Sequence, residues 1–373
     1  MKDKQFEWKE QTKLLKQAIY MKGSYGNYGA LVLPEGRFVI LDRKNLKFLL
    51  PSSGSLYTLP GDWEKWMKRG FIVVALRRAF HLFKYYIFSA HDKRFIVKAK
   101  EVKAYKFLES KSDYFVVRND DLKEAIFNKN GKQISDWFDW ISEYGLTEGE
   151  SEYYMANKNG KEAIFYKDGK QVTEWFDGVL SYGLVEGQSD YYIAIKKGKE
   201  AIFHKDGQQI TDWYSDIDES GLVKGQSDFY VARKGGKAAI FHKDSYQVTD
   251  WFDNVYSNGF VKGQSDFYIA RKKGKAAIFD KSGSQISDWF DDIYSYGLVD
   301  GQTDYYLVKV DKLFYICKLG STKVIGPFDY IWDYGFIGFI KDPSQNTIRI
   351  KMLDNQQKTL TRQEMDDFFE GKE

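Results

Sequence analysis

Residues 227–264 read SDFYVARKGGKAAIFHKDSYQVTDWFDNVYSNGFVKGQ, and residues 265–302 read SDFYIARKKGKAAIFDKSGSQISDWFDDIYSYGLVDGQ. The two stretches agree at 25 of 38 positions, and five of the thirteen differences exchange Val for Ile, Thr for Ser or Phe for Leu. Similarity at a fixed spacing is the signature of tandem duplication. The chain is therefore built from repeats, and its fold depends on what one repeat forms.

The repeat extends in both directions from this pair. Five clear copies occupy residues 112–150, 151–188, 189–226, 227–264 and 265–302, and a degenerate sixth copy occupies residues 303–340. Around them we expect an N-terminal helical segment in residues 1–23, degenerate basic β-repeats in 24–111, and C-terminal strands with a short helix in 341–373. Imperfect end copies are expected because terminal units of an array must face solvent or close it.

Within one repeat the pattern is typical of β-strands. In residues 189–226 the runs YYIAI, EAIFH and QQITDWY are separated by glycine-containing dipeptides, and GLV is expected to form a short fourth strand. Dipeptides ending in glycine between apolar runs indicate two-residue hairpins, since both central residues of a type I′ turn need positive φ. They occur at Asn130-Gly131, Asn159-Gly160, Asp168-Gly169 and Lys273-Gly274.

Glycine recurs about every ten residues, which argues against helices inside the repeats. Helices are expected only at the ends, over Glu7–Tyr20 and Arg362–Phe369, where Thr361 and Glu364 have the spacing of a capping box. The fold class is therefore all-β, made of tandem antiparallel β-meanders. Because residues 71–340 correspond to about seven units, we favour a β-propeller of about seven blades over an open β-solenoid of stacked hairpins.

The motifs KNGKEAIFYKDGKQV (Lys158 to Val172), WFDDI (Trp289 to Ile293) and YGLV (Tyr296 to Val299) resemble the bacterial WG-repeat family. The resemblance covers the five clear units, about half of the chain. The Trp-Gly of that family is replaced here by Glu-Ala or Ala-Ala, as at Ala238-Ala239. The resemblance implies an all-β repeat with a non-enzymatic interaction role.

Charge is distributed unevenly along the 373 residues. Residues 1–110 contain 22 basic and 10 acidic residues, whereas residues 111–302 contain 24 basic and 32 acidic residues. A basic first third can attract nucleic acid or another polyanion, but we favour the interpretation that the two parts complement each other electrostatically or that both are simply solvated. Residues 1–20 are charged throughout, and there is a single cysteine. We therefore expect a cytoplasmic protein without a membrane span or a disulfide.

Three sets of repeated residues are candidates for binding or for structure. Aromatic residues at the start of each repeat could stack on a ligand from the outward face of a strand: Tyr153, Tyr191, Phe229 and Phe267. Lysines at one hairpin tip per repeat could hold a polyanion: Lys161, Lys199, Lys237 and Lys275. Tryptophans are assigned to structural packing between repeats: Trp137, Trp175, Trp213, Trp251 and Trp289.

Little in the sequence favours catalysis. The acidic-aromatic-aromatic-acidic block, such as Asp288 to Asp291, recurs in similar surroundings, whereas acid–base pairs need different environments. Nucleophile-elbow, phosphate-loop and dinucleotide-binding motifs do not occur. Cys317, within LFYICK, is interpreted as a core residue. We expect no enzyme, no cofactor and no metal site.

The sequence therefore favours a non-catalytic scaffold that binds another protein through an aromatic-rich β surface. Aromatic residues are common energetic anchors of such surfaces. The alternative is a multivalent module for carbohydrate or a polyanion such as nucleic acid, in which repetition supplies avidity.

Overall fold

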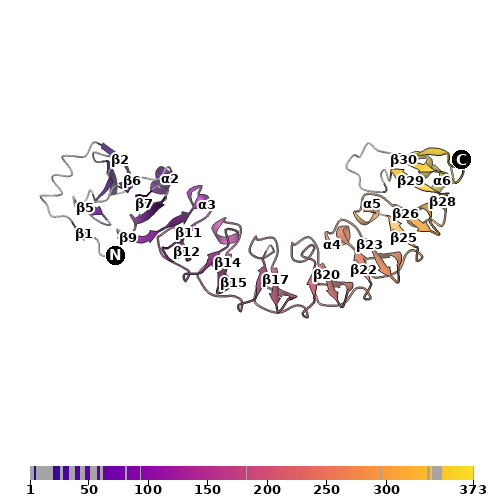
Figure 1. The fold of residues 1–373 in the computed structure, drawn as a ribbon, viewed down its shortest axis with the longest axis horizontal. Helices are drawn as coiled ribbons and strands as arrows, with labels where there is room; N and C mark the ends of the chain where they lie inside the picture. Colours follow the sequence, from indigo (N-terminus) through magenta and orange to yellow (C-terminus); the bar gives the residue numbers. More distant parts are fainter. Residues whose placement is uncertain are drawn as a thin grey trace. The chain divides into compact units, whose positions relative to one another are not determined.

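A computed structural model describes residues 4–5, 20–25, 28–32, 38–42, 47–50, 57–58, 62–79, 82–92, 94–181, 183–294, 296–333, 337 and 347–372. It divides the chain into two compact units, Met1–Gly187 and Gln188–Glu373. Within each unit, small antiparallel sheets follow one another along the chain, with a few short helices between them (Figure 1). The prediction of an all-β repeat fold is confirmed.

The first unit begins with two larger sheets, ordered β1-β5-β4-β3-β2 and β6-β7-β8-β9, followed by the three-stranded sheets β10-β11-β12 and β13-β14-β15. Its elements are β1 (Lys4–Gln5), β2 (Tyr20–Tyr25), β3 (Tyr28–Val32), β4 (Phe38–Asp42), β5 (Lys47–Leu50), β6 (Tyr57–Thr58), α2 (Trp63–Lys68), β7 (Phe71–Ala79), β8 (Leu82–Ser89), β9 (Arg94–Ala99), β10 (Glu101–Lys103), α3 (Tyr105–Leu108), β11 (Tyr114–Arg118), β12 (Glu124–Asn128), β13 (Trp140–Ile141), the 3-10 helix η2 (Gly145–Thr147), β14 (Tyr153–Lys158), β15 (Lys161–Tyr166) and β16 (Gly178–Leu180).

The second unit contains the sheets β19-β20-β21, β22-β23-β24, β25-β26-β27-β28 and β29-β30-β31, preceded by the hairpin of β17 and β18. Its elements are β17 (Tyr191–Lys196), β18 (Lys199–His204), β19 (Asp216–Ile217), β20 (Phe229–Lys234), β21 (Lys237–His242), β22 (Asn254–Tyr256), α4 (Asn258–Val261), β23 (Phe267–Lys272), β24 (Lys275–Asp280), β25 (Asp292–Tyr294), α5 (Tyr296–Val299), β26 (Tyr305–Val310), β27 (Leu313–Lys318), β28 (Val324–Phe328), β29 (Tyr330–Asp333), β30 (Thr347–Lys351), β31 (Gln357–Thr361) and α6 (Arg362–Glu370).

Each of these three-stranded repeat sheets is shared between two neighbouring repeats. β22, near the end of residues 227–264, pairs with β23, the first strand of residues 265–302. β23 then forms a hairpin with β24, and isolated bridges such as Ala276–Phe290 add an irregular fourth segment. The sheets β13-β14-β15 and β19-β20-β21 are built in the same way. The structural unit is therefore displaced from the sequence repeat by one strand.

In the clear repeats, four hairpin turns between the two long strands have positive φ at both central residues: Asn159-Gly160, Lys197-Gly198, Gly235-Gly236 and Lys273-Gly274. This is the type I′ geometry, so the hairpin prediction is confirmed at these turns. The prediction is wrong at Asn130-Gly131 and likewise at Asp168-Gly169, where only the glycine has positive φ. There the Asp168 carboxylate accepts a hydrogen bond from the Lys170 backbone N–H at 2.8 Å, which stabilises a different turn.

The predicted fourth strand does not form. Gly221, Leu222 and Val223 lie in a turn, and the equivalent residues of other repeats form η2, α4 and α5, so the expectation that helices occur only at the chain ends is wrong. A Cβ atom on Gly221 would lie 2.3 Å from the Phe229 carbonyl oxygen, and its φ is +81°. The Leu222 N–H donates to that same carbonyl at 2.9 Å. The segment is therefore a buried helical turn that packs on the next repeat.

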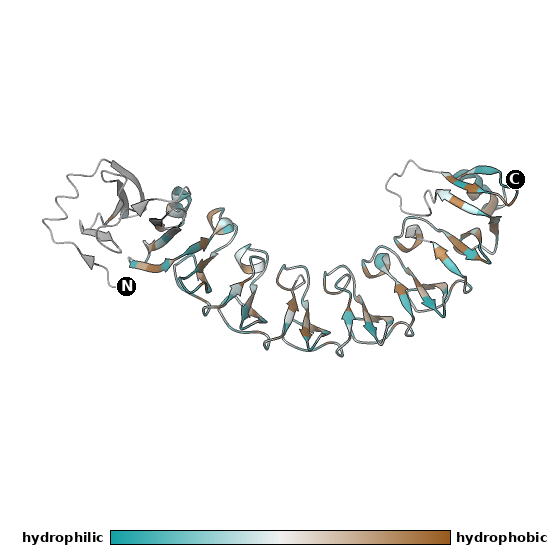
Figure 2. Cartoon of the chain, viewed as in Figure 1, coloured by the Kyte–Doolittle hydropathy of each residue, from teal (hydrophilic) through white to brown (hydrophobic). Residues whose placement is uncertain are grey.

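Both faces of the repeat sheets are buried. Tyr230, Val231 and Ala232 follow one another along β20, and each is at most 1% exposed. Because successive side chains of a strand point to opposite faces, both faces must be covered. Val231 packs with Tyr268 and Ala270 of the following repeat in one core cluster. Figure 2 shows hydrophobic segments recurring from sheet to sheet.

The ends of the chain match the sequence only in part. α6 has the predicted capping box between Thr361 and Glu364. The helix predicted over Glu7–Tyr20 lies outside the described residues, except for Tyr20, which begins β2. The most hydrophobic stretch, residues 71–90, contains the hairpin of β7 and β8. Among the described helices, none is both long and apolar enough to cross a membrane.

The number and closure of blades stay a prediction. The repeat sheets have three strands and single bridges, whereas a propeller blade usually has four strands. The preference for about seven blades over a solenoid rests on the sequence alone. The predicted boundaries of the degenerate segments likewise stay predictions.

Candidate binding site

The predicted lysines lie at the tips of the type I′ hairpins and are exposed. Each faces another lysine across its turn, in the pairs Lys158–Lys161, Lys196–Lys199, Lys234–Lys237 and Lys272–Lys275. Lys161 and Lys275 have a carboxylate of Asp177 or Asp291 at 3.7 Å. Exposed ion pairs of this kind contribute little. The structure thus places these lysines one per repeat on separate tips and does not gather them around a cavity.

The predicted aromatic residues are half-buried instead of facing outward: Tyr153, Tyr191, Phe229 and Phe267. The Phe229 ring lies 5.3 Å from that of His242 on the adjacent strand and 4.7 Å from that of Phe260. The reason is that the face of β20 that carries Phe229 also carries Val231, which packs against the next repeat. These aromatic residues stay candidates, but each offers only part of its ring to a ligand.

The repeat tryptophans are half-buried: Trp137, Trp175, Trp213, Trp251 and Trp289. The Trp251 ring is 5.7 Å from Phe241 in its own repeat and 6.1 Å from Tyr214 in the preceding one. Trp175 and Trp289 have equivalent ring neighbours. Their position fits the structural assignment made from the sequence.

The second carboxylate of the acidic-aromatic block has a structural role. Asp253 accepts a hydrogen bond from the Lys273 backbone N–H, at the hairpin tip of the next repeat, at 2.7 Å. Asp291 accepts one from the Asp311 N–H at 2.8 Å. These carboxylates therefore hold the neighbouring turn. Among the described residues, no three His, Cys, Asp or Glu side chains gather as a metal site.

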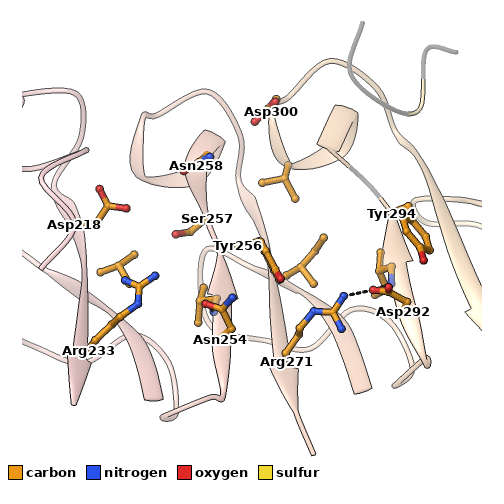
Figure 3. A pocket seen from close by; sticks show the side chains of 15 residues that line it. Asp218, Arg233, Asn254, Tyr256, Ser257, Asn258, Arg271, Asp292, Tyr294 and Asp300 are labelled. Carbon is orange, nitrogen blue, oxygen red and sulfur yellow. Dashed lines mark hydrogen bonds and ion pairs between the residues drawn. The ribbon is translucent and has the colours of Figure 1, made fainter. Parts of the chain in front are cut away.

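A groove that the sequence did not predict crosses three repeats of the second unit (Figure 3). We call it the arginine groove. It has a volume of about 320 Å³. Its lining residues come from equivalent positions of successive repeats: Asp218, Tyr256 and Tyr294; Val231 and Ile269; Arg233 and Arg271; Asn254 and Asp292; Val255 and Ile293; with Ser257, Asn258, Val299 and Asp300 beside them.

The arginine groove coincides with a change in the repeat. In the first three clear repeats a glutamate of the second long strand accepts a hydrogen bond from the last strand: Glu124 from Ile141, Glu162 from Val179 and Glu200 from Ile217, at 2.9, 2.8 and 2.7 Å. In the next two repeats the glutamate is Ala238 or Ala276. There Asn254 and Asp292 accept from the following N–H of their own strand, each at 2.9 Å.

An arginine stands opposite each of these alanines. Arg233 pairs across the strands with Ala238, and Arg271 with Ala276. Arg233 donates to Asp216 at 3.1 Å, and Arg271 donates to Asp292. Burial works against the charge of Arg271, but the neighbouring Asp292 more than offsets this and raises its pKa.

Tyrosine and acidic groups surround the two arginines. Tyr256 is 41% exposed, and the Arg271 guanidinium lies 5.5 Å from the centre of its ring. In Figure 3, Asp218 and Asp300 lie at the loop end of the groove, above the arginines. The groove therefore combines aromatic surface with charges of both signs, which is typical of a recognition site and not of a packed core.

The sequence signal for this groove was a difference between repeats. Glu200 becomes Ala238, while Ile195 becomes Arg233 at the position across the hairpin. A search for positions that all repeats share passes over such paired changes. The predicted sites and the arginine groove consequently contain different residues.

The sequence matches no protein-family model and no curated protein. Solved structures that align with the chain include a eukaryotic initiation factor, with a TM-score of 0.30 and 10% identity over 91% of this chain and 94% of that one. Hsv2 of Kluyveromyces lactis aligns with a TM-score of 0.26 and 11% identity over 72% and 93%. The C-terminal WD40 domain of Sif2 aligns with a TM-score of 0.25 and 8% identity over 78% and 92%. At these TM-scores the alignments carry no conclusion about fold or function.

Proposed function

We propose that the chain is a non-catalytic, WG-repeat-like scaffold of the cytoplasm that binds another protein through the arginine groove. The proposal keeps the function favoured by the sequence but moves the binding surface. The aromatic residues at the repeat starts are half-covered by neighbouring rings, whereas the groove presents Tyr256 beside Arg271.

The observation that carries this proposal is the position of the groove. Three consecutive repeats contribute equivalent residues to one cavity, so an extended peptide can contact all three. Tyrosine and arginine are the residue types enriched at the energetic centres of protein interfaces. The groove offers both residue types. It also lacks the glutamate that accepts a hydrogen bond from the last strand in earlier repeats, because Asn254 and Asp292 of that strand accept this hydrogen bond instead.

Site-specific photo-cross-linking tests the proposal. A benzophenone amino acid placed at Asn258, which is exposed at the groove, should capture a defined protein from the native cell. The same group at Lys281, which is exposed on a hairpin that does not line the groove, serves as the matched control. Equal capture at both positions, or none at either, would contradict the proposal.

The lysine pairs at the hairpin tips favour a second candidate function. Three successive repeats of the second unit each carry two lysines at facing strand positions of a hairpin tip. A polyanion lying along these tips would contact a pair of lysines in each repeat. Binding of heparin that weakens steeply with salt, and that is lost when Lys199, Lys237 and Lys275 are changed to Gln, would support this alternative.

A further inference from the structure

The first clear repeat shows what an arginine at the groove position binds when a carboxylate is present. Arg118 donates from Nε and Nη2 to Glu124 Oε1, at 3.0 and 2.6 Å. The Glu124 side chain is fully buried, and its other oxygen accepts from the Ile141 N–H. The arginine and the carboxylate face each other across the two long strands.

The fifth clear repeat keeps the arginine and lacks the carboxylate. Arg271 takes the position of Arg118, and Ala276 takes that of Glu124. Arg271 Nη2 donates to Asp292, but its Nε is buried and has no hydrogen-bond partner in the part of the chain that the structure describes. The donor that binds Glu124 in the first clear repeat is thus unused in the fifth. It belongs to a side chain that lines the groove.

A buried donor of a charged group without an acceptor is costly, so a ligand that supplies the acceptor gains this energy on binding. Because Nε is closed to solvent while the Arg271 side chain as a whole is 28% exposed, the side chain must rotate toward the groove before a ligand can reach this donor. We propose that the arginine groove binds an acidic side chain from an extended peptide of the partner, whose carboxylate pairs with the Arg271 guanidinium. The inference rests on the proposed function and adds the chemistry of the partner. Arginine with a carboxylate is a strong, charge-assisted pair.

The surroundings of the arginines restrict the rest of the peptide. Asp218 and Asp300 line the loop end of the groove and add two carboxylates there (Figure 3). A run of acidic residues would be repelled there, whereas basic residues beside a single acidic one would be attracted. Tyr256, being exposed, provides an apolar surface next to the carboxylate. The favoured sequence is one Glu or Asp flanked by Lys or Arg.

Selection from a random heptapeptide library displayed on phage, with the full chain as bait, tests this inference. Enriched peptides should share one acidic residue with basic neighbours. The best peptide is then synthesised with a fluorescent label, once as selected and once with its Glu changed to Gln or its Asp to Asn. Affinity measured by fluorescence anisotropy should fall at least tenfold with the neutral peptide.

Two protein variants locate the carboxylate. Arg271→Gln should weaken the acidic peptide at least tenfold and leave the neutral peptide unchanged. Ala276→Glu places a carboxylate of the protein itself opposite Arg271, as Glu124 is opposite Arg118. This carboxylate should occupy the arginine and so weaken binding of the peptide. Lys281→Gln is the control and should bind as the parent does. Circular dichroism and thermal melting verify that each variant is folded, and either of the two groove variants alone suffices for the test.

Several outcomes would overturn the inference. They are no enrichment of acidic peptides, equal binding of acidic and neutral peptides, or parental affinity in a folded Arg271→Gln or Ala276→Glu protein. Loss of binding on C-terminal amidation, but not on neutralising the acidic side chain, would assign the carboxylate to a chain terminus and also overturn it. If cross-linking at Asn258 persists in the Arg271→Gln protein, the groove remains the proposed binding site, but the inference that Arg271 binds a carboxylate is wrong.

Discussion

Replacing Tyr268 by phenylalanine should stabilise the protein, although Tyr268 is among its most deeply buried side chains. The residue is 0% exposed, and its hydroxyl has no hydrogen-bond partner among the described residues. Leaving a buried polar group unsatisfied costs about 1–3 kcal/mol. Phenylalanine keeps the ring, which stacks on Phe279 at 5.6 Å, and removes only the hydroxyl. We therefore expect a gain of about 1 kcal/mol in the free energy of unfolding.

Tyr305→Phe is the matched control, because the Tyr305 hydroxyl donates to Asp366. Tyr305 is only 2% exposed. Losing this hydrogen bond should therefore lower the free energy of unfolding by about 1.5–3 kcal/mol, the usual range for a hydrogen bond to a charged group. Urea titrations followed by tryptophan fluorescence measure both changes. If Tyr268→Phe lowers the midpoint as Tyr305→Phe does, the hydroxyl of Tyr268 has an acceptor and the reasoning is wrong.

The pH dependence provides a second readout of the same substitution. Burial raises the pKa of Tyr268 above its usual value of 10.0. Above pH 10 the unfolded chain therefore loses a proton that the folded chain retains, so the stability of the parent falls as pH rises. The advantage of Tyr268→Phe should widen in that range. A constant difference between pH 7 and pH 11 would contradict this.

Three further predictions concern the turns, the thiol and the array. Asp253→Ala should cost about 1 kcal/mol by removing the acceptor of the Lys273 N–H, whereas Asp250→Ala, at an exposed position, should change the urea midpoint little. Burial raises the pKa of Cys317 to about 11, so a thiol reagent at pH 8 should label it only after unfolding, and fast labelling of the native protein would contradict its burial. Deletion of residues 227–264 should make a propeller poorly soluble or much less stable, whereas a soluble product with a near-parental melting temperature would favour the solenoid.

The repeat and its hairpins could be predicted because they depend on local rules. The Asn159-Gly160 and Lys273-Gly274 dipeptides both adopt the backbone conformation that their glycine favours. The segment Gly221 to Val223 was wrongly predicted as a strand, since a short apolar run does not distinguish a strand from a buried helical turn. Only the contact of Gly221 with the Phe229 carbonyl, made in three dimensions, decides between them.

The arginine groove was missed for a different physical reason. The predicted Lys273-Gly274 turn already places Arg271 opposite Ala276, but nothing in the sequence marks the cavity that Arg271 lines. An alanine in a β-strand has no chemistry of its own. The significance of Ala276 is seen only by comparison with Glu124, which has the same position in the first clear repeat and accepts a hydrogen bond from Arg118.

The displaced boundary between sheet and repeat has a consequence for how the array can be assembled. Since β22 completes the sheet of the following repeat, a single 38-residue copy cut at its sequence boundaries would lack one edge of its sheet and carry an orphan strand. Backbone hydrogen bonds are therefore part of the coupling between neighbours, in addition to side-chain contacts. In a nearest-neighbour description such coupling is large compared with the stability of one copy. An isolated copy should remain unfolded, and a nascent chain should gain stable structure only as successive copies leave the ribosome together.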